Sequence, residues 1–561
     1  MDRNSAIGLT LIAALLLVYF TYFGPKPETV KPTLTQQEAI DSTRQQSGAD
    51  LTQPADPLKT DSTLIKQYGT LASLLSGEAK TTTIETSDLA INFSTRGGII
   101  KELELKNYRT YSREKLLLVT ERNNLVSLIT QYNGREIDLA RLYYESDLKK
   151  NGDTTVLNFT ATLSDGSFIK QSYKIPSTGY KIGYKLEAKG FALTGQNITL
   201  LWNDKVPVQE KDINDSRTKT TINYYSASGD FDGLSEASTS LESDVLANPI
   251  KWVAIRQKFF INSIIAKKYF TGGEVSTVAN VADLSIVKEA NVKLFIPGAD
   301  VTAGAEFDLY FGPNDYDINK TVTEGFTKNL SFGWPPMLWI TKYALIPIFQ
   351  FLESFISNYG IIIVLLVILV KLILLPLSYK SYLGMAKMKL LKPELDLIKE
   401  KNGDNMTQNQ QDQMKLYQQA GVNPFSGCIP LLLQMPILFS MFWFFPMAIQ
   451  LRQQPFLWAE DLSTYDSIAS LPFTIPFYGD HVSLFVLLMT ASQIIFAWQQ
   501  NQISSVQGPM KSMSYIMPVI FLFVLNSFSA GLSFYYFVSN LVTFAQRPLS
   551  SALLMKIRSR R

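Results

Sequence analysis

The chain has 561 residues, of which 46% are hydrophobic and 18% are charged, and its formal net charge is +3. This length allows several domains, and the apolar content is too high for a wholly soluble protein. The net charge is too small to indicate a nucleic-acid partner by itself. A single cysteine, Cys428, excludes a disulfide within the chain, and a single histidine, His481, leaves little from which to build a zinc site or a serine-histidine triad.

The first predicted element is a membrane anchor over residues 1–24. Its apolar run, residues 6–24, is about as long as a hydrocarbon core requires. No small-x-small cleavage site precedes Pro25 and Pro27, so we expect the anchor to stay uncleaved. Residues 25–80 are rich in Pro, Thr, Gln, Ser and Asp, which predicts a disordered tether.

Residues 81–330 predict one large antiparallel β domain. Short alternating segments such as SFIKQSYKI and YKIGYKLEAKG are separated by Gly, Asn and Asp turns. This alternation is typical of strands that bury one face. The next segment, 331–355, mixes large apolar residues with Lys342 and Glu353, which predicts an amphipathic helix at a membrane interface.

Five further hydrophobic segments predict membrane spans, and the anchor makes six. We expect these spans at 356–379, 427–449, 482–498, 513–527 and 531–546. The segments between and after them are loops at 380–426, 450–481 and 499–512 and a basic tail at 547–561.

The orientation of the spans follows from the basic residues of the loops, because lysine and arginine are retained on the cytoplasmic side. Loops 380–426 and 499–512 and the tail together hold thirteen of them, whereas loop 450–481 holds only Arg452. We therefore expect both termini in the cytoplasm and the β domain in the periplasm.

Lys371 interrupts the apolar run LLVILVKLILLP. An ionised amine within a span is costly unless it meets water or a polar partner, so such residues usually mark a functional site. The simpler interpretation is that the long side chain carries the ammonium toward the cytoplasmic end of the helix. Polar residues in other spans favour a wet pocket, although each of them can equally join two helices by a hydrogen bond. These residues are Gln434, Gln493, Asn526, Ser533, Tyr535, Tyr536, Ser539, Asn540 and Thr543.

The loop at 380–426 contains two charged, weakly amphipathic stretches on either side of Asn402-Gly403-Asp404, which predicts a helical hairpin with a glycine turn. A solvated loop without a partner is the alternative. The basic face of such a hairpin would suit ribosomal RNA or anionic lipid head groups.

Three segments resemble signature segments of the YidC/Oxa/Alb family of membrane-protein insertases. They are KMKLLKPEL, GVNPFSGCIPLLLQMPI and GLSFYYFVSNLVTFAQR. The order of anchor, large external domain, interfacial helix and five-span core resembles the Gram-negative type of this family. The resemblance implies a polytopic α-helical membrane protein with a five-helix core around a hydrophilic groove, and a periplasmic all-β supersandwich domain.

The resemblance also implies roles for individual residues. Lys371 takes the place of the groove arginine of the family, and an ammonium lacks the planar fork of that guanidinium. Val367 stands where some members have a threonine. The expected groove residues are Lys371, Gln434, Asn526, Ser533, Tyr535 and Tyr536. The hairpin resembles the element of the family that receives nascent chains, with Lys387, Lys389, Lys392 and Lys399 on it.

The implied function is that of an insertase and chaperone for newly made inner-membrane proteins, acting alone or with the Sec translocon. We expect nascent membrane proteins, the Sec translocon, the ribosome and the lipid bilayer as partners, and no cofactor, metal, catalytic activity or small-molecule substrate. The β domain resembles the fold of sugar mutarotases, but residues 81–330 contain no histidine for acid-base work, and the chain has no GxxxxGK[ST] phosphate loop.

Two other functions stay open at this point. An ion-coupled transporter could use Lys371 as its proton or substrate site, although the five clustered spans contain no internal repeat of the kind such folds usually have. A membrane-anchored periplasmic carbohydrate enzyme is opposed by the missing histidine but not by the carboxylates of the domain.

Overall fold

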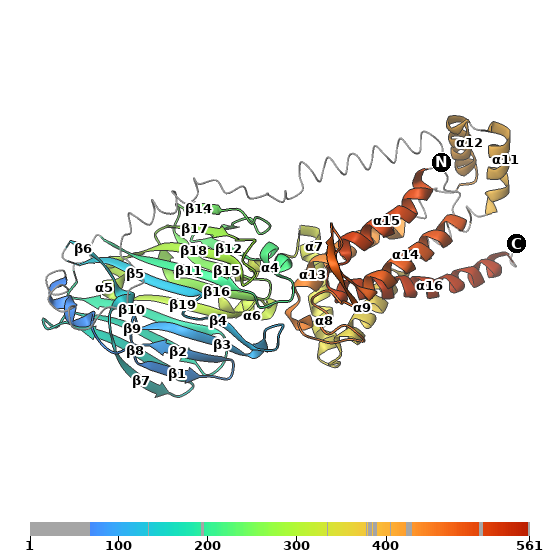
Figure 1. The fold of residues 1–561 in the computed structure, drawn as a ribbon. Helices are drawn as coiled ribbons and strands as arrows, with labels where there is room; N and C mark the ends of the chain where they lie inside the picture. Colours follow the sequence, from blue (N-terminus) through green and yellow to red (C-terminus); the bar gives the residue numbers. More distant parts are fainter. Residues whose placement is uncertain are drawn as a thin grey trace.

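The structure is a computed structural model that describes residues 68–132, 134–191, 196–333, 335–376, 378–379, 384, 387, 390–403, 405–421, 429–503 and 509–558. A large β domain lies at one end and a bundle of helices at the other (Figure 1). The predicted anchor, 1–24, and most of the predicted tether lie outside the described residues.

Three antiparallel sheets build the β domain. One contains β1 Thr81–Glu85, β2 Leu89–Ser94, β3 Ile99–Arg109 and β4 Lys115–Val119, in that order. The largest runs β13 Phe231–Gly233, β12 Thr221–Ser226, β15 Ile250–Arg256, β16 Phe260–Phe270, β19 Ala305–Pro313, β10 Lys181–Lys189, β9 Phe168–Pro176, β8 Thr154–Thr162 and β7 Glu145–Asn151. The third runs β14 Glu242–Leu246, β17 Gly273–Val278, β18 Ile286–Pro297, β11 Asn197–Pro207, β5 Asn124–Tyr132 and β6 Arg135–Asp138.

The period-two pattern of the sequence explains these sheets. Along β10, for example, buried and half-buried residues alternate from Lys181 to Ala188, because successive side chains of a strand point to opposite faces. The buried faces form one apolar core, in which the ring of Tyr173 lies about 5 Å from the rings of Phe93 and Tyr184. The prediction of an antiparallel β domain is confirmed.

Short helices fill the connections of the domain. They are η1 Gly69–Leu74, η2 Leu139–Arg141, α4 Ile213–Thr218, α5 Gly298–Ala303, α6 Tyr316–Val322 and η3 Phe326–Asn329. The first of them corrects the predicted extent of the tether, 25–80. Leu71 is fully buried in the domain core, so the C-terminal end of that segment is ordered because its leucines contribute to the core.

The helical part starts with a broken helix and continues into the bundle. The broken helix consists of α7 Pro335–Ile340, the π-helical turn η4 Thr341–Leu345 and α8 Ile346–Glu353. Pro347 lacks the N–H that a regular helix needs at this point, which accounts for the irregular turn before it. The remaining helices are α9 Tyr359–Ile373, α11 Lys392–Asn402, α12 Met406–Gln419, α13 Ile429–Met447, η6 Ile449–Leu451, α14 Leu484–Ile503, α15 Pro509–Leu525 and α16 Ala530–Arg558.

Some boundaries of the bundle differ from the predicted ones. Helix α16 continues beyond 546 as far as Arg558, through the good helix formers of SALLMK. The loop predicted at 450–481 contains a two-stranded sheet of β20 Ala469–Ile475 and β21 Gly479–Val482. Within the described ranges, no helix combines the length and the apolarity that a membrane crossing requires.

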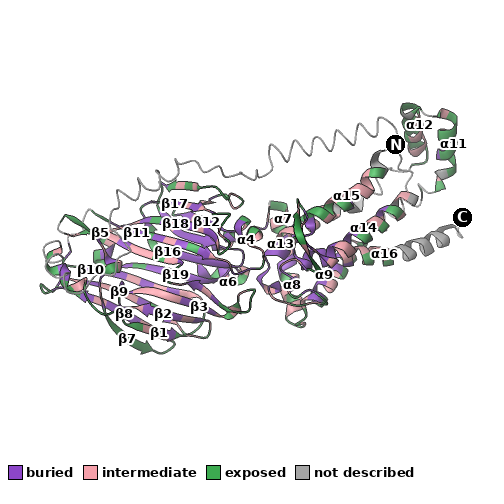
Figure 2. Cartoon of the chain, in the orientation of Figure 1, coloured by how far each residue is buried: buried purple, intermediate pink, exposed green. Residues whose placement is uncertain are grey.

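The bundle has its own apolar core, separate from that of the β domain. Its buried side chains come mainly from α9, α13 and α16, and include Leu366, Phe445 and Tyr535. Figure 2 shows this core in purple where the bundle meets the β domain, whereas the far ends of α14 and α15 are half-buried or exposed. The bundle is therefore densely packed at one end and opens toward the other.

Candidate functional site

Lys371 lies where three helices meet. It occupies the last turn of α9, and its Nζ donates hydrogen bonds to Gln434 Oε1 of α13, at 3.2 Å, and to Thr543 Oγ1 of α16, at 3.0 Å. Thr543 Oγ1 donates in turn to the carbonyl of Ser539, at 2.8 Å. The lysine is half-buried, and its chain neighbours Leu372 and Ile373 are exposed. The cation therefore faces the inside of the bundle while the adjacent apolar side chains face outward.

The partners of this ammonium are neutral. Among the described residues, Lys371 forms no salt bridge, and its two partners are an amide oxygen and a hydroxyl oxygen. An ammonium has three N–H donors, of which these two contacts use two. The site thus presents a positive charge that is oriented by hydrogen bonds but not neutralised.

A second polar group lies between α16 and α14. Asn540 Nδ2 of α16 donates to Ser492 Oγ of α14 at 2.8 Å. Asn540 and Thr543 are three residues apart on α16, and this spacing puts them on one face of the helix. Nearby on α14, Thr490 Oγ1 and Gln493 Oε1 are buried without a hydrogen-bond partner within the described part of the chain. Polar side chains therefore extend from the lysine along α16 to Ser492 of α14, and Thr490 and Gln493 add buried polar groups elsewhere around α14.

The two predicted tyrosines have different surroundings. Tyr535 is 1% exposed, and its ring packs 5.7 Å from that of Phe445 in the core of the bundle. Tyr536 is half-buried and meets Tyr535 edge-on at 6.0 Å. Ser533 is buried, and its hydroxyl has no partner among the described residues. Only Tyr536 of these three keeps part of its side chain accessible.

Asn526 belongs to another cluster. Its Nδ2 donates to the carbonyls of Tyr478 and His481, both at 2.8 Å, and its Oδ1 accepts from the backbone N–H of Ser483 at 3.1 Å. It is fully buried in the turn between α15 and α16. The structure thus ties Asn526 to the loop before α14 rather than to Lys371. Val367, at the position of the family threonine, is a buried core residue.

The sequence of the whole chain has close relatives. It is 44% identical to the membrane protein insertase YidC of Amoebophilus asiaticus over 560 residues, which cover 98% of this chain and 92% of that protein. The chain belongs to the YidC family of membrane protein insertases.

Other sequence comparisons agree with this YidC-family membership. The membrane protein insertase YidC of Cytophaga hutchinsonii is 45% identical, over 98% of this chain and 90% of that one. Residues 81–346 match the family described as YidC periplasmic domain, and residues 351–556 match the family described as 60Kd inner membrane protein. A solved structure of an active YidC insertase is similar at 18% identity and a TM-score of 0.34, over 84% of this chain and 93% of that chain.

The hairpin of this YidC-family chain consists of α11 and α12. Gly403 forms the turn with φ +53°, and Asn402 Nδ2 donates to Asp412 Oδ2 across it at 3.0 Å. Lys387 and Lys399 are exposed. Lys389 and the side chain of Lys392 lie outside the described residues. Figure 1 shows the hairpin at the end of the bundle farthest from the β domain.

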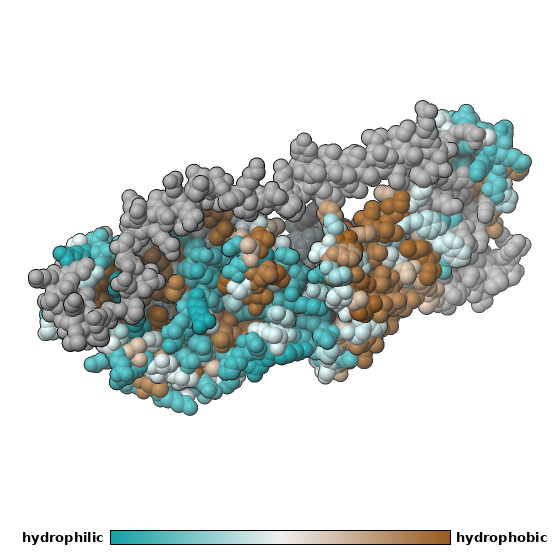
Figure 3. All heavy atoms as spheres, viewed as in Figure 1, coloured by the Kyte–Doolittle hydropathy of each residue, from teal (hydrophilic) through white to brown (hydrophobic). Residues whose placement is uncertain are grey.

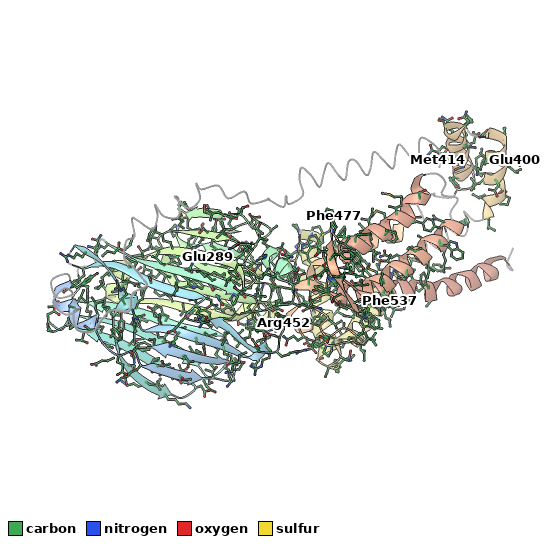
Figure 4. All side chains as sticks on the ribbon, viewed as in Figure 1. Glu289, Glu400, Met414, Arg452, Phe477 and Phe537 are labelled. Atoms are coloured by element: carbon green, nitrogen blue, oxygen red, sulfur yellow. The ribbon has the colours of Figure 1, made fainter. Side chains whose placement is uncertain are left out.

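A second cation of this YidC-family chain, Arg452, was not predicted as a functional residue. It follows η6, and its Nε donates to Glu210 Oε1 of the β domain at 2.8 Å, while its guanidinium carbon lies 5.2 Å from the centre of the Phe260 ring. Burial raises the pKa of Glu210, although Arg452 and Lys258 oppose this shift. Figure 4 labels Arg452 at the junction of the two parts of the molecule. Its isolation among acidic residues of the loop was visible in the sequence, but its partner was not.

Proposed function

We propose that the polar face of α9, α13, α14 and α16 is the groove through which this chain inserts membrane proteins. The polar end of a substrate helix enters beside Lys371, and the apolar part then moves sideways into lipid. The groove shortens the apolar path that the polar end must cross. Burial of the apolar substrate segment drives the transfer, at about 25 cal/mol per Å² removed from water.

The neutral surroundings of Lys371 carry this proposal. A buried cation that is paired with a carboxylate is largely neutralised, whereas the ammonium of Lys371 is held by Gln434 and Thr543 with no carboxylate beside it among the described residues. At an effective dielectric constant of about 20, a carboxylate 4 Å away would be attracted by about 4 kcal/mol, from which the cost of desolvating the two charges is subtracted. The groove should therefore favour acidic polar segments.

The unpartnered polar atoms add to this support. Thr490 Oγ1, Gln493 Oε1 and Ser533 Oγ are buried without a protein partner among the described residues. Leaving such a buried atom without any hydrogen-bond partner, including water, costs about 1–3 kcal/mol. A groove that holds water, or the polar backbone of a passing chain, satisfies these atoms.

The same proposal includes the six predicted spans, with both termini in the cytoplasm and the β domain in the periplasm. The face of the bundle that is visible in Figure 3 is mostly apolar and lies between the more hydrophilic surfaces of the β domain and of the α11–α12 hairpin. An apolar band between two hydrophilic ends suits a protein that is embedded in a bilayer. In this orientation α11 and α12 lie in the cytoplasm and Lys371 lies near the cytoplasmic end of α9.

The exposed lysines of the hairpin suggest the partners. Lys387 and Lys399 are placed to meet nascent chains, ribosomal RNA or anionic head groups. We include the ribosome and the Sec translocon as proposed partners of this surface and of the bundle. The β domain acts in this scheme as a non-catalytic module, since acid-base chemistry on sugars commonly uses a histidine that residues 81–330 lack.

The charge of Lys371 can be tested with matched substrates. Lys371→Ala should slow the insertion of a substrate with an acidic translocated tail about tenfold, because a contact of about 1.4 kcal/mol is lost, and should affect a neutral tail much less. Lys342→Ala, at the interfacial segment, is the control and should affect neither. Equal loss for both tails would contradict guidance by the groove charge.

The route itself can be tested by crosslinking. A photo-crosslinker at Gln434 should capture a nascent membrane protein during synthesis, because this side chain lies beside the cation. A crosslinker at Tyr535 is the matched control, since that ring is buried in the core. Adducts only on the β domain would rule out the groove route.

A further inference from the structure

The β20–β21 hairpin is an exposed apolar projection at the end of the bundle. Phe473 is 62% exposed and Phe477 is 77% exposed, and most residues of β20 are exposed as well. Between Ser467 and Val482 the acidic and basic residues are confined to Asp480 and His481. Figure 2 shows the hairpin in green beside the buried part of the bundle, and Figure 4 labels Phe477 on it. Such a group of aromatic side chains usually marks a contact surface.

The turn of this hairpin holds a phenylalanine in an unfavourable backbone conformation. The N–H of Tyr478 donates to the carbonyl of Ile475 at 3.1 Å, which closes a four-residue turn with Pro476 at its second position. Phe477, at the third position, has φ +66°. Glycine or asparagine is the usual residue at such a position, because a larger side chain is strained there. Residues held in such strained conformations cluster at functional sites.

The base of the hairpin is rigid. Asn526, in the turn between α15 and α16, donates to the carbonyls of Tyr478 and His481. The ring of Tyr478 packs edge-on against Phe523 of α15, at 5.5 Å. Asp466 accepts from the backbone N–H groups of Leu484 and Phe485 at the start of α14. The exposed rings are therefore held at a fixed level relative to α14 and α15.

We propose that this hairpin lies in the head-group layer of the outer membrane leaflet, with Phe473 and Phe477 as its anchors. The inference rests on the proposed function, because it takes α14 and α15 as spans. Strand β21 ends at Val482 and α14 begins at Leu484, so the hairpin lies at the level where α14 leaves the bilayer. Interfacial elements bury phenylalanine and tryptophan rings at the boundary between head groups and acyl chains. The anchored hairpin fixes the depth of α14 and α15 beside the groove.

Two observations favour lipid over a protein partner. Pro472 and Pro476 lack the N–H groups that a partner strand would need along β20 and its turn, so the hairpin is a poor template for strand addition. The exposed rings of Tyr343 and Phe351, on η4 and α8, lie in the segment predicted to be interfacial. If the β20–β21 hairpin and the η4–α8 segment lie in the same membrane interface, both are expected to expose aromatic rings.

The experiment places an environment-sensitive fluorophore on single cysteines of the full-length protein. Cys428→Ser provides the background, because Cys428 is the only cysteine of the chain. Phe477→Cys carries the label on the hairpin, Val245→Cys carries it on the β domain, and Ile495→Cys carries it on an exposed position of α14. The labelled proteins are reconstituted into phosphatidylethanolamine–phosphatidylglycerol vesicles with a nitroxide at either the head group or the middle of the acyl chain.

We expect the label at 477 to emit at shorter wavelength in vesicles than the label at 245, and to be quenched most by the head-group nitroxide. The label at 495 should be quenched most by the mid-chain nitroxide. Water-like emission at 477 without quenching, together with normal quenching at 495, would overturn the hairpin inference and leave the topology intact. Absence of quenching at both positions would overturn both.

A protein partner gives a different result. If a second copy or another protein covers the hairpin, the label at 477 emits at shorter wavelength but neither nitroxide quenches it, and the lipid inference fails.

A further variant separates anchoring from folding. Phe477→Gly relieves the strained turn and should preserve thermal stability. A fluorophore on a cysteine at exposed position 474 should then emit at longer wavelength than it does with Phe477 present, because the hairpin moves toward water. Unchanged emission from position 474 would contradict anchoring by the ring.

Discussion

Two cations, Lys371 in the bundle and Arg452 at the junction with the β domain, are surrounded in opposite ways. Arg452 is bonded to the Glu210 carboxylate and lies over the ring of Phe260, and its side chain is 3% exposed. Lys371 is half-buried, and its partners are the neutral oxygens of Gln434 and Thr543.

The difference separates a structural charge from an available one. The attraction between Arg452 and Glu210 acts inside the protein, where it holds the β domain against the loop after α13. Lys258 strengthens this junction, since its Nζ pairs with Asp215 at 2.8 Å and donates to the carbonyl of Ser463 at 3.2 Å. The charge of Lys371 has no such partner among the described residues, which is why the proposed function assigns it to the substrate.

Arg452→Met should have the largest effect on stability. Removing one member of a buried ion pair leaves the other charge uncompensated, at a cost of about 3–5 kcal/mol. We expect faster hydrogen exchange around Glu210 and a lower unfolding temperature. Adding Glu210→Gln should recover most of the loss, and a single variant as stable as the parent would show that the pair is not structural.

Asp204→Asn extends the comparison to a buried carboxyl group that has no cation beside it among the described residues. Burial raises the pKa of Asp204 to about 7, and a hydrogen bond from Asn262 opposes the shift. The folded state therefore keeps the proton up to about pH 7, whereas the unfolded chain releases it near its ordinary value of 3.8. The free energy of unfolding therefore contains a favourable contribution from Asp204 at low pH, and this contribution is lost as the pH rises from about 4 to about 7.

The variant should accordingly be more stable than the parent at pH 8, by about 2–4 kcal/mol, and nearly equal to it at pH 4. Thermal unfolding of the full chain at several pH values measures this. A stability difference that is independent of pH would mean that Asp204 does not titrate in this range.

Lys371→Met should change stability by no more than about 1 kcal/mol, because the loss of two hydrogen bonds is offset by the removal of the cost of desolvating the ammonium. It leaves only neutral groups behind, unlike Arg452→Met. Insertion of substrates with acidic tails should nevertheless fall severalfold. Unfolding in detergent and insertion into vesicles, measured on the same preparation, test the two halves of this prediction. A large loss of stability would make Lys371 a structural residue like Arg452.

Thr543→Val should have the smallest effect on insertion. It removes one hydrogen bond to the ammonium and one to the carbonyl of Ser539, at a cost of about 0.5–1.5 kcal/mol in stability. Because the charge of Lys371 remains, the preference for acidic tails should persist, and insertion of these substrates into vesicles should fall less than about twofold. Loss of the preference would mean that Thr543 itself is needed to orient the cation.

How well the sequence predicted each feature depended on how far apart in the chain the interacting residues are. The strands were predictable because the alternation of apolar and polar residues along each strand shows which face is buried. The end of the tether was predicted wrongly because its leucines pack against residues that are distant in the sequence. Of the expected groove residues, Lys371 and Gln434 come together, whereas Asn526 bonds to the loop before α14. The sequence does not distinguish a polar residue that lies beside Lys371 from one that hydrogen-bonds to a loop, because it does not show which side of the helix faces which neighbour.

The sequence by itself determined the family, the β domain and the presence of a lone cation in an apolar run, because these depend on composition and local order. Only the tertiary structure decided which charges are neutralised. Arg452 and Glu210 are 242 residues apart, and Lys371 and Thr543 are 172 apart. Whether a charge is satisfied depends on what the fold brings within a few ångströms of it, and electrostatic attraction and desolvation act over that distance in space regardless of separation along the chain.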